Sequence, residues 1–263
     1  MSFLQAFIIA MIEGLTEFLP VSSTGHMILA DSLLKVKDPE FTKTFEIVIQ
    51  LGAIFSVVLL YRKRFLKNTS IYLKLLVAFL PTGIIGFLAY KSIKTYLFNP
   101  ITVSISLIAG GVLLILLDRW SKKEDSAYAD LEDISYFAAF KIGLIQCLSM
   151  VPGVSRAAAT IFGGVYAGFN RSQAAEFSFL LAVPTMLAAA GYDLLKEKEN
   201  IHSEDLSMLL FGGLVAFVVA ILAIKAFIAF LNKYGFKHFG YYRILLGIGF
   251  LIFAYATGLQ LKA

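Results

Sequence analysis

Charged residues are scarce in this chain. They make up 16% of its 263 residues, against roughly a quarter in an ordinary soluble domain, and the mean hydropathy is +0.79. This composition excludes an ordinary soluble domain and predicts an integral membrane protein. The net charge is +5, and the basic residues occur in short clusters between apolar runs, as in residues 61–64 and 119–123. Such clusters are typical of loops that flank membrane spans, so we expect no nucleic-acid partner.

Cysteine is nearly absent as well. Cys147 is the single cysteine, which excludes a disulfide within the chain and a metal centre built from several cysteines. No Lys or Arg precedes Lys35, and Glu13 and Glu17 interrupt the first apolar run. A cleavable signal peptide needs a basic start and an unbroken apolar core, so we expect this segment to stay in the mature protein.

Long apolar runs, in contrast, are abundant. A helix needs about 20 residues to cross about 30 Å of hydrocarbon. Six segments are long and apolar enough: Phe45 to Tyr61, Ile71 to Tyr90, Pro100 to Leu117, Ser172 to Leu195, Leu206 to Leu231 and Tyr241 to Leu259. We predict that each is a transmembrane helix.

Two further apolar regions are interrupted by a proline. Residues 3–34 break at Pro20, and residues 134–168 break at Pro152. The helix after each break would have about 12 residues and cover roughly 18 Å, which is too short to cross. We therefore expect two re-entrant hairpins, which enter the membrane and return to the same side.

The two interrupted regions resemble each other. Residues 13–16, EGLT, align with residues 146–149, QCLS, and the alignment continues through the two prolines and from Ser23 to Ser155. Each half then has one hairpin followed by three spans. Because three is odd, the second half begins on the opposite membrane face, and such inverted repeats typically enclose a site near the midplane. We predict an all-α membrane protein with one domain, 1–263, and inverted repeats at about 1–120 and 134–263.

Basic residues give only a small bias for orientation. Nine lie in loops after the first, third and fifth spans: Arg62, Lys63, Arg64, Lys67, Arg119, Lys122, Lys123, Lys233 and Lys237. Eight lie on the other side: Lys35, Lys37, Lys43, Lys91, Lys94, Lys196, Lys198 and Lys262. Because the first set is more tightly clustered, the positive-inside rule makes it cytoplasmic. The mouth of the first hairpin would then face outward.

The densest polar cluster is the stretch EGLTEFLPVSSTGH, residues 13–26. Glu13 and Glu17 are four residues apart and share one helix face, where like charges repel. A carboxylate at membrane depth is costly, so a divalent cation, an arginine or a shared proton must compensate it. The alternative is that both carboxylates reach water at the mouth of the hairpin.

Three hydroxyl residues and a histidine follow in the same stretch. Ser22, Ser23 and Thr24 open the second helix, where one hydroxyl suffices as the N-cap and the free N–H groups favour a phosphate. Gly25 allows such a ligand to approach the backbone closely. His26 lies in the first turn of this helix and is either a packing residue or a proton carrier.

The second hairpin contributes a cation. Arg156 ends the run PGVSR, and its planar guanidinium matches the oxygens of a phosphate. An ion pair with Glu13 or Glu17 is an alternative role for this arginine, and the two roles are compatible. If the hairpins face each other, these groups converge on one cavity. The combination predicts phosphoryl chemistry on an amphiphile whose tail lies between helices.

EGLTEFLPVSSTGH from Glu13 and PGVSR from Pro152 resemble the two signature regions of the undecaprenyl-diphosphate phosphatase family, also called the bacitracin-resistance protein family. The resemblance covers essentially the whole chain. It implies hydrolysis of undecaprenyl diphosphate to undecaprenyl phosphate and inorganic phosphate, which recycles the lipid carrier for peptidoglycan synthesis. It also implies a multi-pass protein of the bacterial inner membrane, an outward-facing active site and a divalent cation, Mg²⁺ or Ca²⁺. A homodimer is compatible with the sequence.

The resemblance also assigns roles to single residues. The matching positions are Glu13 and Glu17 in the acidic motif, Ser23 and His26 as nucleophile or proton-transfer pair, Ser155 and Arg156 as phosphate clamp, and Thr160 at the end of the second motif. This chain departs from the family after the arginine, because Ala157 and Ala158 stand where Ser-Gly is usual. A hydrogen bond from that serine is therefore not essential here.

Two mechanisms and three functions stay open. We expect Glu13 and Glu17 to hold the cation and Arg156 to stabilise charge on the phosphoryl group. Either Ser23 attacks with His26 as the proton carrier, or water attacks with His26 as the base. A secondary transporter or lipid flippase is the main alternative, since inverted repeats with broken helices are common in transporters. A lipid-binding scaffold would leave the cluster of ionisable residues unexplained.

Overall fold

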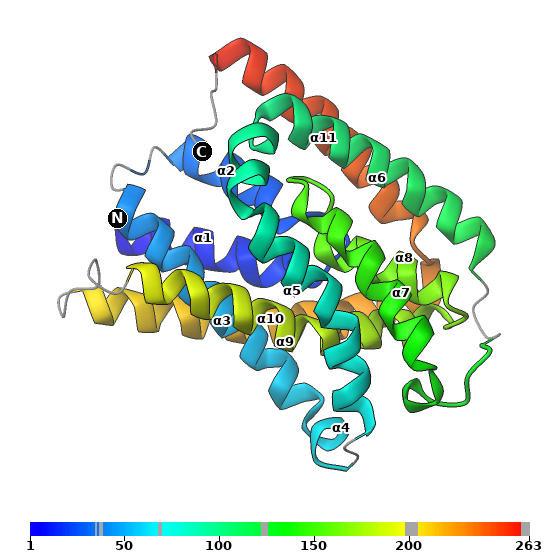
Figure 1. Cartoon of the computed structure of the whole chain (residues 1–263). Helices are drawn as coiled ribbons and strands as arrows, with labels where there is room; N and C mark the ends of the chain where they lie inside the picture. The colour runs from blue at the N-terminus through cyan, green and yellow to red at the C-terminus, as the bar shows by residue number, and fades with distance from the viewer. Residues whose placement is uncertain (35, 37–38, 68–69, 122–125, 198–204, 259–263) are drawn as a thin grey trace.

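A computed structural model describes residues 1–34, 36, 39–67, 70–121, 126–197 and 205–258. Within these ranges the regular elements are all helical (Figure 1). The first half contains α1 (Phe3–Thr16), α2 (Ser23–Leu34), α3 (Pro39–Leu60), α4 (Arg62–Lys67), α5 (Ser70–Leu97) and α6 (Pro100–Trp120). The second half contains η1 (Leu131–Asp133), α7 (Tyr136–Gln146), η2 (Cys147–Met150), α8 (Arg156–Tyr166), α9 (Arg171–Glu197), α10 (Leu206–Tyr234) and α11 (Lys237–Thr257).

Six of the described helices are long and apolar enough to cross a membrane, namely α3, α5, α6, α9, α10 and α11. They coincide with the six predicted spans but extend further at some ends. The candidate span in α3 begins at Glu40 instead of Phe45, and α11 begins at Lys237 instead of Tyr241. The predicted spans end where the apolar run meets polar residues, whereas the helices continue through their backbone hydrogen bonds to the helix cap.

Some sequence-based predictions fall on residues outside the described ranges. They concern the end of the sixth span at Leu259 and the orientation lysines Lys35, Lys37, Lys122, Lys123, Lys198 and Lys262.

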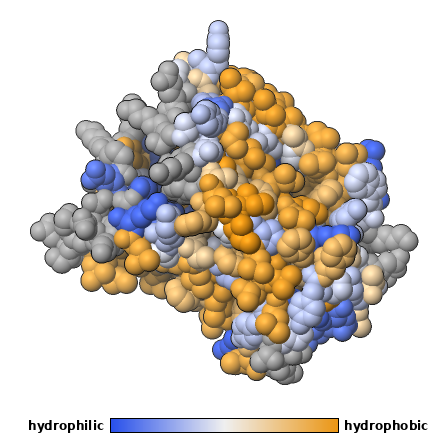
Figure 2. Space-filling view, viewed as in Figure 1, coloured by the Kyte–Doolittle hydropathy of each residue, from blue (hydrophilic) through white to orange (hydrophobic). Residues whose placement is uncertain are grey.

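The surface of these helices is strongly apolar. Figure 2 shows hydrophobic residues across the centre of the visible face, with hydrophilic residues gathered toward its left and right edges. In α5, for example, Phe87 and Leu88 are 75% and 77% exposed. A soluble protein rarely exposes a continuous apolar surface of this kind, whereas a bilayer covers it. The chain is therefore a multi-pass membrane protein.

Both interrupted regions form the predicted pairs of short helices, α1 with α2 and α7 with α8. α1 packs along α10, and α7 packs along α5. Glycines permit both contacts: a Cβ at Gly14 would lie 2.7 Å from the carbonyl oxygen of Ala216, and a Cβ at Gly143 would overlap the carbonyl oxygen of Ala78. Each short pair thus contacts the second long helix of the other half of the chain.

The remaining long helices pair across the halves as well. α3 contacts α9, and Phe45 and Phe177 on these helices are fully buried. α6 and α11 lie side by side along one edge of the molecule (Figure 1). Residues of α3 and α9 therefore lie between the two halves of the chain.

A polar network joins the ends of several elements away from the turns. Arg64 of α4 donates hydrogen bonds to Asp130 at 2.7 Å and to Glu176 of α9 at 2.9 Å. The hydrogen bond from Arg64 holds the pKa of the Asp130 carboxyl below its ordinary value. This network fixes α9 relative to α4 and the loop before α7.

Candidate active site

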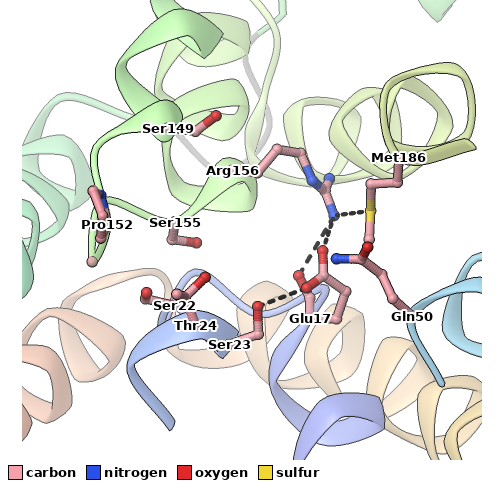
Figure 3. Close-up of a pocket in the computed structure, with 11 residues that line it drawn as sticks. Glu17, Ser22, Ser23, Thr24, Gln50, Ser149, Pro152, Ser155, Arg156 and Met186 are labelled. Atoms are coloured by element: carbon pink, nitrogen blue, oxygen red, sulfur yellow. Dashed lines mark hydrogen bonds and ion pairs between the residues drawn. The ribbon is translucent and has the colours of Figure 1, made fainter. Parts of the chain in front are cut away.

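The turns of the two hairpins face each other across a cavity of about 130 Å³ (Figure 3). Its walls come from both turns and from the central helices α3 and α9. The lining residues are Glu17, Ser22, Ser23, Thr24, Gln50, Ser149, Pro152, Gly153, Ser155, Arg156 and Met186. The acidic, hydroxyl and basic residues that the sequence singled out therefore meet in one place.

A serine with an unusual backbone conformation closes each turn. Ser22 and Ser155 have φ angles of 69° and 74°, and they are the non-glycine residues with positive φ in the described part of the chain. Each lies directly before a helix, α2 or α8. Such a conformation costs about 1–3 kcal/mol and tends to persist where function requires it. By this geometry the counterpart of Ser155 is Ser22, one residue before the Ser23 that the sequence alignment paired with it.

Both helices begin at the cavity and offer free backbone donors there. The Ser155 hydroxyl accepts a hydrogen bond from the N–H of Ala158 at 3.2 Å, so the N–H groups of residues 155–157 have no helical acceptor. In α2 the first helical bond is donated by the N–H of His26 to Ser22, at 3.4 Å. Two helix N-termini that open on one cavity favour an anion.

Glu17 connects the two hairpins. Its Oε1 accepts a hydrogen bond from Arg156 at 3.1 Å, and its Oε2 accepts one from the Ser23 hydroxyl at 2.6 Å (Figure 3). The side chains of Arg156 and Glu17 are only 11% and 6% exposed, so water screens their charges little. A hydroxyl bonded to a carboxylate that a third group orients is the arrangement of an activated nucleophile.

α9 and the turn that follows α1 hold the guanidinium of Arg156 in place. Its Nη1 donates to the carbonyl oxygen of Ser178 at 2.9 Å, and the guanidinium lies 5.6 Å from the centre of the Phe18 ring. The Thr160 hydroxyl donates to the Ser178 hydroxyl at 2.6 Å. Thr160 is fully buried and does not line the cavity, and it contacts the site through Ser178 and through the carbonyl oxygen of Arg156 at 2.9 Å. The Nε of Arg156 has no hydrogen-bond acceptor among the described residues.

Glu13 is buried one helical turn before Glu17. It is 4% exposed, it does not line the cavity, and its Oε1 has no hydrogen-bond partner within the described ranges. An orphaned carboxylate oxygen suits a cation or a proton. Mg²⁺ is usually held by one or two carboxylates together with substrate oxygens. In the described chain no group of three or more His, Cys, Asp or Glu residues is arranged to hold a metal ion, so substrate oxygens would have to complete the site.

His26 lies outside the cavity lining, as does Gly25. Its Nδ1 is 2.8 Å from the carbonyl oxygen of Ser22, which can only accept, so Nδ1 carries the proton. Its Nε2 then accepts a hydrogen bond from the Tyr242 hydroxyl at 2.6 Å, and the two rings are stacked. The predicted proton carrier therefore contacts the turn and α11 rather than Ser23.

Several residues at the site were missed by sequence analysis. Gln50 and Ser178 are polar residues within the predicted spans, and Tyr242 follows a charged helix start. Polarity within an apolar run was the available signal for Gln50 and Ser178. Met186 carries no such signal, because methionine is unremarkable in an apolar helix, and Ser149 appeared only as the last residue of the aligned segment QCLS.

The sequence of this chain is similar to known proteins over nearly its whole length. The family model for the bacitracin resistance protein BacA matches residues 6–249. An undecaprenyl-diphosphatase of Flavobacterium psychrophilum is 52% identical over 255 residues, which cover 96% of this chain and 96% of that protein. An undecaprenyl-diphosphatase of Bdellovibrio bacteriovorus is 50% identical over 262 residues, which cover 100% and 99%. One of Aquifex aeolicus is 45% identical over 250 residues, which cover 95% and 97%.

Proposed function

The chain belongs to the bacitracin resistance protein BacA family, and from this membership we infer that it is an undecaprenyl-diphosphatase. It hydrolyses undecaprenyl diphosphate to undecaprenyl phosphate and inorganic phosphate, which returns the lipid carrier to peptidoglycan synthesis at the bacterial inner membrane. The observation that carries this function is the convergence of two helix N-termini and Arg156 beside a hydroxyl–carboxylate pair.

The diphosphate head group binds where the two turns meet. The free N–H groups at the start of α2 and α8 are donors for its oxygens, and the guanidinium of Arg156, which lines the cavity, supplies positive charge. During phosphoryl transfer negative charge develops on the phosphoryl oxygens and the leaving group. Donors that are already oriented toward those oxygens stabilise this charge without reorganisation.

Ser23 is the proposed nucleophile, and Glu17 accepts its proton. The Ser23 oxygen forms a bond to the terminal phosphorus while the bond from that phosphorus to the bridging oxygen breaks, so undecaprenyl phosphate leaves. Water then hydrolyses the phosphoserine and releases inorganic phosphate. The hydrogen bond of 2.6 Å between Ser23 and Glu17 supports this route. A proton-carrier role for His26 stays a prediction, and it requires the imidazole to release Tyr242.

A divalent cation, Mg²⁺ or Ca²⁺, fits the carboxylates beside this cavity. Glu13 and Glu17 would hold it, and the orphaned Oε1 of Glu13 supports this assignment. When bound, such an ion neutralises charge on the diphosphate. Arg156 competes with the cation for Glu17, because it already binds one oxygen of that carboxylate.

Inverted repeats with re-entrant hairpins are the architecture we propose for this enzyme. The packing of α1 on α10 and of α7 on α5 supports it, because each hairpin makes the same kind of contact with the other half. The matching serines with positive φ, Ser22 and Ser155, support it as well. With the clustered basic loops in the cytoplasm, the active site opens to the outer side.

Phosphate release from a polyprenyl diphosphate by the purified protein in detergent tests the function. We expect release in the presence of Mg²⁺ or Ca²⁺, because hydrolysis needs no gradient across a membrane. A transporter or flippase of the same fold would release none under these conditions. Inactive, correctly folded wild-type protein would overturn the proposed function.

A further inference from the structure

Arg243 of α11 is a buried cation that uses all its donors on backbone carbonyls. Its side chain is 0% exposed, and none of the ion pairs found among the described residues includes it. The acceptors are carbonyl oxygens of Leu107 for Nε at 3.4 Å, Pro20 and Val154 for Nη1 at 3.2 and 2.9 Å, and Ser106 and Gly153 for Nη2 at 3.1 and 2.8 Å. A guanidinium has five N–H groups, so this set exhausts them.

The acceptors of Arg243 lie in both turns that form the cavity. Pro20 belongs to the first turn and precedes Ser22 by two residues, and Val154 belongs to the second turn and directly precedes Ser155. One guanidinium therefore links the two strained serines through the backbone. The carbonyls of Ser106 and Leu107 tie the same guanidinium to α6.

Because the peptide bond is planar, the hydrogen bonds of Arg243 also set the direction of a backbone N–H group at the cavity. In a trans peptide the carbonyl and the following N–H point in opposite directions. Because the Val154 carbonyl is directed at Arg243, the N–H of Ser155 is directed away from Arg243. Ser155 lines the cavity and is the N-cap of α8, the helix that offers its N-terminus to the head group.

We propose that Arg243 is a positioning residue for phosphoryl transfer. It holds the two turns at one separation and fixes the orientation of the peptide between Val154 and Ser155, directly before the N-terminus of α8. Its hydrogen bonds reach neither Ser23 nor Glu17, so it positions these residues through the backbone of the turns. The inference rests on the proposed function in that the ligand of the cavity is a phosphate or diphosphate group.

Gly110 of α6 provides a way to move Arg243 without removing it. A Cβ at Gly110 would overlap Nη2 of Arg243 and lie 2.7 Å from its Cζ. Gly110→Ala therefore forces the guanidinium to shift while its charge stays. Arg243→Lys also keeps the charge, but it reduces five donors in a planar fork to three on one nitrogen.

Two control variants separate positioning from general stability. Gly249→Ala lies on the same helix as Arg243, and its Cβ would meet nothing within 4 Å. Arg171→Lys changes another mostly buried arginine, which pairs with Asp118 at 3.1 Å and does not touch either turn. Each variant is measured in detergent for its melting temperature, for the increase in that temperature caused by orthovanadate or inorganic phosphate, and for kcat and KM.

We expect Arg243→Lys and Gly110→Ala to lose most of the stabilisation by vanadate and phosphate. A misplacement of about 1 Å is enough for a loss on the order of 100-fold in kcat, whereas KM should change little because the contacts of the lipid tail are untouched. The two controls should keep vanadate binding and kcat, even if Arg171→Lys melts earlier.

Vanadate or phosphate stabilisation of folded Gly110→Ala and Arg243→Lys equal to that of wild type would overturn the inference, whatever their melting temperatures. If Arg243→Lys fails to fold, Gly110→Ala decides alone. Wild-type protein could bind vanadate or phosphate but show no phosphatase activity, with this binding lost in Arg243→Lys and Gly110→Ala. That result would leave the inference intact and reject the proposed function. Full activity in wild type and in both variants would reject the inference alone.

Discussion

At the scale of single residues, Glu17 makes two contacts that depend on its negative charge. It accepts hydrogen bonds from Ser23 and from Arg156, both largely shielded from water. Glu17→Gln removes the base and leaves the arginine without an anionic partner. We expect kcat to fall by about 10²–10⁴-fold, the usual contribution of general base catalysis, and the melting temperature to drop because a buried ion pair is broken.

Glu176→Gln is the matched control for this change. Glu176 is also a partly buried carboxylate paired with an arginine, Arg64, but it lies in the network away from the turns. The control should lose stability while kcat stays near the wild-type value. Equal losses of kcat in the two variants would argue against a chemical role for Glu17.

Ser23 and Ser149 both line the cavity, but only Ser23 is bonded to the carboxylate. With Ser23→Ala we expect no phosphoenzyme at early times and a loss of most activity, since the nucleophile is removed. With Ser149→Ala we expect activity close to wild type. Rapid quenching followed by detection of phosphoserine distinguishes the variants.

The alternative route predicts a different isotope result. If water attacks directly, one turnover in ¹⁸O-labelled water transfers the label into phosphate without a phosphoenzyme. Substantial activity in Ser23→Ala together with this labelling would favour water as the nucleophile and His26 as its base.

At the scale of helices, the close contacts of α1 with α10 and of α7 with α5 depend on glycine. We expect Gly14→Ala and Gly143→Ala each to destabilise the protein by about 1–3 kcal/mol, because the added methyl group meets backbone atoms that cannot move independently. Thermal unfolding in detergent measures the effect. Gly249→Ala is the control, since its position is open.

Gly14→Ala and Gly143→Ala should lose similar amounts of stability if the two hairpins pack equivalently in inverted repeats. A large loss at one position and none at the other would contradict that equivalence. The comparison tests the repeat through packing, independently of the few residues that the two halves share in sequence.

The helices also show how far sequence analysis reaches. Hydropathy and the prolines at 20 and 152 predicted the six spans and the two interrupted regions, because burial in lipid and the missing N–H of proline act locally. Which side chains reach the cavity depends on packing between distant segments. His26 was predicted at the reaction centre, but Tyr242 lies far along the chain and binds its Nε2. Arg243 was missed because a single arginine within an apolar span gives no indication of its partners.

At the scale of the whole molecule, the proposed orientation gives each loop a defined side of the membrane. Cysteine labelling tests it, because Cys147 is the only native thiol and Cys147→Ala removes it. In that background, Lys63→Cys places an exposed thiol on the side of the clustered basic loops, and Thr95→Cys places one at the opposite end of α5. With the active site facing outward, a membrane-impermeant maleimide should label Thr95→Cys in intact spheroplasts and Lys63→Cys only after permeabilisation. Both variants must retain phosphatase activity for the comparison, and the reverse labelling pattern would turn the active site toward the cytoplasm.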